Sequence, residues 1–235
     1  MAKNYIIEHM EEGMHDWCKL EYEHMVSVCG PDHVYFTALT PSTLAGMPES
    51  LSKAHCHKED ILTMGDRIPH EKVCLLDPAS PHVLCPEDGD KFDFFLFGGI
   101  LGDDPPRDRT GELRKLGFAT RHLGSIQMTT DTALNVTRRV VEGRVPLDQI
   151  PFVDHPEIKL RKNETVTMPF RYIAIPPKES PSSATATTTG ESSSTADETA
   201  ASTKKSKKPK QLQPLLPPGM IELLKKDNDT ALDLF

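Results

Sequence analysis

Short apolar runs separated by longer polar segments predict a chain of alternating strands and helices. Seven short, mainly apolar runs are predicted strands: they cover residues 4–8, 33–39, 72–76, 92–97, 118–123, 150–153 and 166–173. Strands that alternate with helices favour an α/β fold, in which a mostly parallel sheet has helices on both faces.

Two longer segments have the spacing of amphipathic helices. Residues 15–29 place an apolar residue at every third or fourth position, and a glycine-proline pair ends this predicted helix. Residues 130–142 show the same spacing, with a threonine able to cap the start and a glycine the end. The segment 40–67 has a weaker pattern and is predicted to be a helical connection.

Residues 176–210 differ in composition from the rest of the chain. Most of this segment is Ser, Thr, Ala, Pro and acidic residues, and it ends in a short basic run. Such a composition buries too little apolar surface to fold, so we predict a disordered insert. The basic run is interpreted as a solvated linker, with a nuclear signal as the alternative. This divides the chain into a domain over 1–175, the insert, and a tail over 211–235 whose helix docks on the domain.

Charge and cysteine content limit the partners and the compartment. Residues 1–175 contain 19 Lys and Arg against 27 Asp and Glu, so this part carries the whole net charge of −8. An acidic domain repels phosphate backbones and attracts basic partners. The five cysteines include no CxxC pair, and no apolar stretch is long enough to span a membrane. We expect a cytoplasmic protein with reduced thiols.

Three predicted strands end in loops marked by glycine or proline. These loops begin at Leu75, Phe97 and Leu123, and the first runs through Asp77-Pro78. Ligands bind at the carboxyl ends of parallel strands, and glycine lets a ligand approach the backbone closely. Tight turns would explain any single loop, but three together predict a ligand site. A side chain at Gly99 is expected to block the ligand and leave the fold intact.

The loops favour a ligand with a cationic end. Neither of the common phosphate-binding glycine motifs is present, and the loop at Gly98 runs into acidic residues. An adenosine-like ligand with a positive charge fits better than a polyphosphate. His55-Cys56-His57 with Cys74 lacks the spacing of zinc ligands, so no metal is predicted. Trp17 is interpreted as a core residue.

Several motifs together resemble a known enzyme class. They are Tyr5–Gly13, Val73–Pro78, Phe97–Asp103, Pro105–Thr110, Gln127–Ala133, Met168–Tyr172 and Pro218–Ile221. They are similar to the SPOUT class of methyltransferases, in particular to the fungal protein arginine methyltransferase branch that modifies a small-subunit ribosomal protein. The resemblance covers most of residues 3–173 and the tail. The 176–210 insert looks longer than that branch needs, and residues 40–70 show little resemblance.

The resemblance implies a deep trefoil knot and S-adenosyl-L-methionine bound in a bent shape within it. The cofactor residues that it implies by position are Leu75, Leu76, Asp77, Pro78, Phe97, Gly98, Gly99, Ile100, Leu101, Gly102, Leu123, Gly124, Gln127, Met128, Thr129 and Thr130. The methyl group is already activated in this cofactor, so the reaction needs in-line positioning more than acid–base chemistry.

An arginine acceptor keeps its charge, so its site must supply carboxylates. Candidates for the catalytic acids are Glu8, Asp103, Asp104 and Asp108, and candidates for substrate binding are Glu11, Glu12 and Asp16. Any one of these could instead be a solvated or helix-capping acid.

Three functions are compatible with these features. The first is methylation of an arginine in a basic, ribosomal protein, and the second is RNA methylation on the same fold. The third is a ribosome-associated binding protein that keeps a cofactor pocket without turnover. The acidic domain favours the protein substrate and argues against direct nucleic-acid binding, because an RNA enzyme normally carries a basic stripe. Most of the class are dimers, whereas the branch that this chain resembles favours a monomer.

Overall fold

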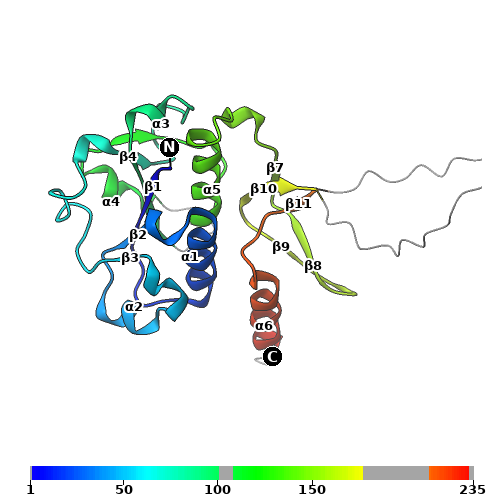
Figure 1. Ribbon diagram of the computed structural model, residues 1–235. Coiled ribbons are helices and arrows are strands. Elements are labelled where there is room, and N and C mark those ends of the chain that lie inside the picture. Colours follow the sequence, from blue (N-terminus) through cyan, green and yellow to red (C-terminus); the bar gives the residue numbers. More distant parts are fainter. Residues whose placement is uncertain (1, 101–107, 177–211, 233–235) are drawn as a thin grey trace, which may run out of the picture.

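A six-stranded parallel sheet forms the centre of the protein (Figure 1). The computed structural model describes residues 2–100, 108–176 and 212–232. The strands of this sheet are β1 (Asn4–His9), β2 (Val34–Thr37), β3 (His55–Cys56), β4 (Val73–Leu76), β5 (Phe94–Gly99) and β6 (Ala119–Arg121). Their order is β3-β2-β1-β5-β4-β6, and every neighbouring pair is parallel.

Helices lie on both sides of this sheet. They are α1 (Asp16–Cys29), α2 (Pro41–Gly46), α3 (Asp88–Lys91), α4 (Gly111–Arg114), α5 (Thr130–Val141) and α6 (Met220–Leu232). Short 3-10 turns occur at Pro31–His33, Glu49–Lys53, His70–Lys72 and Leu147–Gln149. Helices α1 and α5 pack against each other on one face of the sheet (Figure 1). Among the residues described here, no helix is long and apolar enough to cross a membrane.

Apolar residues fill both faces of the sheet, because successive side chains of a strand point to opposite sides. In β1, Tyr5 and Ile7 belong to the core under α1 and α5, and Ile6 belongs to a second core on the other face. The second core is closed by α4 and by apolar residues between 61 and 68. The predicted α/β fold with a mostly parallel sheet is confirmed, while the trefoil knot stays a prediction.

The segment 40–67 is mostly not the helical connection that its pattern predicts. It contains the short helix α2, a 3-10 turn, strand β3 and further turns. Thr40 caps α2, since its hydroxyl accepts from the Thr43 N–H at 3.1 Å. Strand β3 pairs over two residues only, so it has no periodicity that the sequence could reveal. Burial of Ile61 and Met64 fixes the later part of this segment on the sheet.

The C-terminal part builds a smaller antiparallel unit beside α5. Strand β10 (Arg171–Ile175) pairs with β7 (Phe152–Asp154) and β11 (Gln213–Pro214), and β8 (Glu157–Arg161) forms a hairpin with β9 (Glu164–Thr167). The single strand predicted over 166–173 is wrong: β9 ends before Pro169, which has no N–H to donate, and β10 begins after it.

Helix α6 packs against α1 and β8, which places the end of the described chain on the domain (Figure 1). Its Leu224 joins an apolar cluster that includes Ile158, Leu160 and Tyr172. The predicted insert at 176–210 lies almost wholly outside the described residues.

Gly99 ends β5 and lies against α1. A β-carbon placed on Gly99 would lie 2.5 Å from Tyr22 Oη, 2.9 Å from Ile7 Cγ2 and 3.1 Å from the Glu8 carbonyl oxygen. A side chain here therefore meets the packed core instead of open pocket. These contacts indicate that a side chain at Gly99 lowers the stability of the fold, an effect that the sequence does not predict.

We predict that Gly99→Ala lowers the free energy of unfolding by about 1–3 kcal/mol, because overpacking forces the buried neighbours to move. Gly98→Ala is the matched control: its β-carbon would meet the flexible end of Ile100 (Cδ1 at 2.7 Å), which can shift. Denaturant unfolding of both variants measures the difference. Equal losses for the two would show that the contact between Gly99 and α1 does not limit this position.

Candidate active site

A pocket of about 920 Å³ lies at the carboxyl ends of β4, β5 and β6. This volume is near the upper end of the roughly 300–1,000 Å³ usual for small-molecule sites. Most of the predicted cofactor residues line it, namely Leu76, Asp77, Pro78, Phe97, Gly98, Ile100, Leu123, Gly124, Gln127, Met128, Thr129 and Thr130. The three loops therefore do meet at one site, as their positions after parallel strands predict.

Four of the predicted cofactor residues are not in this lining. Leu75 belongs to the core on the opposite face of the sheet, because it alternates with Leu76 along β4. Gly99 faces α1. Leu101 and Gly102 lie outside the described residues.

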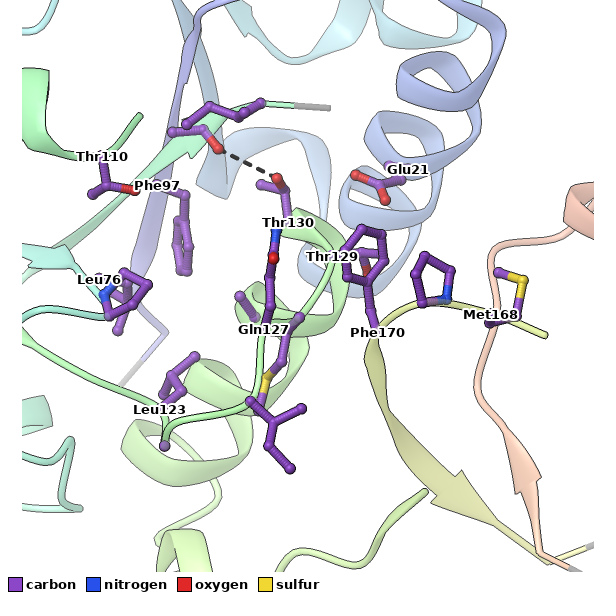
Figure 2. A pocket seen from close by; sticks show the side chains of 18 of the residues that line it. Glu21, Leu76, Phe97, Thr110, Leu123, Gln127, Thr129, Thr130, Met168 and Phe170 are labelled. Atoms are coloured by element: carbon purple, nitrogen blue, oxygen red, sulfur yellow. Dashed lines mark hydrogen bonds between the residues drawn. The ribbon is translucent and has the colours of Figure 1, made fainter. Parts of the chain in front are cut away.

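Hydrogen bonds hold the loops of the pocket together. The Thr130 hydroxyl donates to the Gly98 carbonyl oxygen at 3.2 Å, which joins the start of α5 to the end of β5 (Figure 2). The Arg171 N–H donates to the Gln127 carbonyl at 2.9 Å, so β10 supports the loop before α5. The side-chain oxygen Oε1 of Gln127 is buried and has no hydrogen-bond partner among the described residues. A ligand donor would satisfy this oxygen.

Arg114 of α4 neutralises two of the acids that line the pocket. Its guanidinium donates to both oxygens of Asp77, at 2.5 and 2.7 Å, and to both oxygens of Asp108, at 2.9 and 3.1 Å. The bonds to Arg114 hold the pKa of Asp108 below its ordinary value. Asp77 is almost fully buried, whereas Asp108 is exposed. Asp108 lines the pocket as predicted, but its charge is already paired within the protein.

The other predicted acids lie outside the pocket lining. Glu8 is buried, where its carboxylate accepts from the Thr37 hydroxyl and from the Ile61 N–H, and burial raises its pKa. Glu11 pairs with Arg109 at 2.5 Å. Asp16 pairs with Lys19 at 2.8 Å, and Glu12 is exposed.

Asp103 and Asp104, the remaining predicted catalytic acids, lie outside the described residues.

One wall of the pocket comes from residues that the sequence does not assign to a ligand site. It is formed by Trp17 and Glu21 of α1, residues 166–170 at and after the end of β9, and Leu224 of α6. Trp17 packs on the C-terminal apolar cluster, as a core residue would, but it also faces the pocket. The spacing of four residues between Trp17 and Glu21 could have signalled a shared helix face. The hairpin and α6 carry no local signal, because only tertiary packing brings them here.

Glu21 is buried and interacts with a second buried acid. The Trp17 Nε1–H donates to Glu21 Oε1 at 2.8 Å. Burial, and then the charge of Asp131, raise the pKa of Glu21 well above its ordinary value. Asp131 itself is satisfied, since it accepts from the Thr129 hydroxyl at 2.7 Å and contacts His24 Nδ1 at 2.9 Å.

The charges that line the pocket all have one sign. Among the described residues the charged side chains in the lining are Glu21, Asp77 and Asp108, and none is Lys, Arg or His. Such a surface favours a cationic ligand and repels phosphate. Within the described residues no group of three or more His, Cys, Asp or Glu could hold a metal ion.

The fold and the site define a class of protein. The dual-specific Trm10 of Thermococcus kodakaraensis shares the fold with a TM-score of 0.50 at 18% identity, over 63% of this chain and 96% of that one. The two proteins thus share the fold that the parallel sheet organises.

The family follows from closer relatives. The family model of SFM1-like protein arginine N-methyltransferases matches residues 4–184. Protein arginine N-methyltransferase SFM1 of Saccharomyces cerevisiae is 36% identical over 97% of both chains. The structure of yeast SFM1 complexed with S-adenosylmethionine is 37% identical, with a TM-score of 0.75, over 97% of this chain and 92% of that one. Its complex with S-adenosylhomocysteine has a TM-score of 0.73 at 36% identity, over 94% of both. This chain belongs to the SFM1-like family.

We predict that Arg114→Gln lowers the free energy of unfolding by about 1–3 kcal/mol, because Asp77 then keeps a buried charge without its cation. Arg144→Gln is the matched control, since Arg144 pairs with Asp90 where both side chains are exposed. That change should cost less than about 1 kcal/mol. Adding Asp77→Asn to Arg114→Gln should restore part of the loss. Equal unfolding energies for the two arginine variants, measured by denaturant titration, would contradict this role.

Proposed function

We propose that this protein transfers the methyl group of S-adenosyl-L-methionine to an arginine side chain of a basic protein in the cytoplasm, and that a small-subunit ribosomal protein is the substrate. Membership of the SFM1-like family supports the reaction. The observation that carries the proposal is the pocket lined by carboxylates with no described basic side chain. Both a sulfonium cofactor and a guanidinium acceptor are cations, which a lining with no described basic side chain does not repel.

The residues of the pocket fit this cofactor. Leu76, Phe97, Leu123 and Met128 supply apolar walls for a flat base, and the buried Gln127 Oε1 supplies an acceptor that lacks a donor. When bound, the cofactor supplies a methyl group that is already activated by its positive sulfur. The chain then has to exclude water and hold the acceptor in line. Leu75 and Gly99 pack in the core next to the loops that would hold the cofactor. Leu101 and Gly102 are still proposed to contact the cofactor.

The charge of the chain supports a protein substrate over RNA. Residues 1–175 carry the net charge of −8, and Glu11, Glu12 and Asp16 lie at the loop and first turn that lead to Trp17 in the pocket wall. These acids attract a basic protein and repel a phosphate backbone. The likeness to Trm10 concerns the fold alone. We propose that Glu12 contacts the substrate and that the enzyme acts as a monomer.

We predict that incubation with labelled S-adenosylmethionine and small ribosomal subunits places the label in protein. Digestion with protease should release the label, and digestion with nuclease should not. Because opposite charges steer the substrate, transfer should weaken as salt screens them over about 8–10 Å. Glu12→Gln should raise the KM for the protein substrate with little change in cofactor affinity. Label that only nuclease releases would overturn the proposal in favour of an RNA substrate.

We predict that Gln127→Leu weakens S-adenosylhomocysteine binding by roughly 5- to 30-fold, the equivalent of one hydrogen bond of about 1–2 kcal/mol. Its thermal stability should stay the same or rise, because an unpaired buried oxygen is removed. Calorimetry measures the affinity, and Gln149→Leu, at an exposed position outside the pocket, is the control. Unchanged affinity would place the cofactor elsewhere.

A further inference from the structure

We propose that Glu21 binds the guanidinium of the acceptor arginine, with Trp17 and Phe170 as aromatic walls of that subsite. This inference rests on the proposed function and assigns the acceptor half of its pocket. Figure 2 shows Glu21 and Phe170 on one side of Thr130, with Leu76 and Phe97 on the other. The pocket thus has a second half apart from the ends of β4 and β5.

Within the described residues, Glu21 differs from the other acids of the lining in having no lysine or arginine partner. Asp77 and Asp108 share the guanidinium of Arg114. No lysine or arginine of the described residues forms an ion pair with Glu21, whose carboxyl group accepts from the Trp17 indole at 2.8 Å and from the Asp131 backbone N–H. Asp77 and Asp108 already bind Arg114 of the same chain. Glu21 is therefore the carboxylate of the described lining that can bind an arginine of the substrate.

The surroundings of Glu21 favour the arrival of a positive charge. Glu21 is 5% exposed and interacts with the buried Asp131, which itself contacts His24 Nδ1 at 2.9 Å. The Tyr172 hydroxyl is also buried near both acids and lacks a hydrogen-bond partner among the described residues. A buried acid without a cation is costly, and a guanidinium would relieve that cost.

The geometry suits an arginine better than a lysine. Glu21, Trp17 and Phe170 all line the pocket; Trp17 donates a hydrogen bond to Glu21 and packs on the apolar cluster that contains Phe170. A planar guanidinium stacks on aromatic rings and donates several hydrogen bonds in one plane, which an ammonium group does not do. The Trp17 indole fixes one oxygen of Glu21 and so orients the carboxylate before the substrate binds.

The chemistry then balances with Glu21 as the proton acceptor. A bond forms between a guanidinium nitrogen and the methyl carbon. The bond from that carbon to sulfur breaks and leaves its electron pair on sulfur. The nitrogen loses one proton, which passes to the Glu21 carboxylate and then to water.

Trp17 provides a direct readout, because it is the one tryptophan in the chain. Protein saturated with S-adenosylhomocysteine is titrated with an Arg-Gly-rich peptide, and with the same peptide carrying lysine in place of arginine. The tryptophan fluorescence of the natural protein should respond to the arginine peptide and far less to the lysine peptide. Glu21→Gln should weaken arginine-peptide binding by roughly 10- to 100-fold, the effect of a charged hydrogen bond.

The second measurement is methyl transfer. Glu21→Gln should lower kcat/KM for the protein substrate by at least the same factor and leave S-adenosylhomocysteine affinity within about twofold. Glu23→Gln is the matched control, because Glu23 lies on the same helix, accepts from Ser50 and is outside the pocket. Glu21→Asp keeps the charge but shortens the side chain by one methylene, so its loss of kcat/KM should be intermediate. This variant replaces Glu21→Gln in the test if Glu21→Gln does not fold.

Two results would overturn this assignment. One is a Glu21→Gln protein that binds the arginine peptide and transfers methyl groups as the natural protein does. The other is a loss of S-adenosylhomocysteine affinity that equals the loss of activity, which would assign Glu21 to the cofactor. A natural protein that binds the arginine peptide through Glu21 and methylates only RNA would overturn the proposed function and leave the guanidinium subsite standing.

Discussion

Strand β5 pairs in parallel with β1 on one side and with β4 on the other, and this arrangement fixes where the pocket lies. Because parallel strands end at the same edge, the loops after β4, β5 and β6 must converge there. The sheet is buried on both faces, so its register is strictly specified. A slip of one residue would exchange Leu76, which lines the pocket, for Leu75, which fills the opposite core.

Charge pairing inside the protein determines which acids remain for a ligand. Arg114 forms ion pairs with Asp77 and Asp108, and Arg109 forms an ion pair with Glu11. These internal arginines stabilise loops that carry more acid than base. They also reduce the acidic surface of the pocket to one carboxylate without a cation, Glu21, within the described chain. The electrostatics of the site therefore depend on arginines that do not line it as much as on the acids that do.

The segment after residue 150 completes the site. The hairpin of β8 and β9 and helix α6 pack on one another, and α6 also packs on α1. Together they bring residues 166–170 and Leu224 to the pocket, opposite the strand-end loops. Phe170 and Trp17 thus come from distant parts of the sequence and meet through this packing. The site is shared between a parallel sheet and a smaller antiparallel unit.

The sequence by itself determined the elements whose patterns are local. The helices at 15–29 and 130–142, the strands at β1, β4 and β5, and the strand-end loops with Gly98 and Gly124 follow from spacing and turn residues. Only the tertiary structure decided that Gly99 packs against Tyr22 and that Glu21 lines the pocket. It also decided that Arg114 forms ion pairs with Asp77 and Asp108. Periodicity shows which face of an element is buried, but the partner on that face is set by packing between segments far apart in the chain.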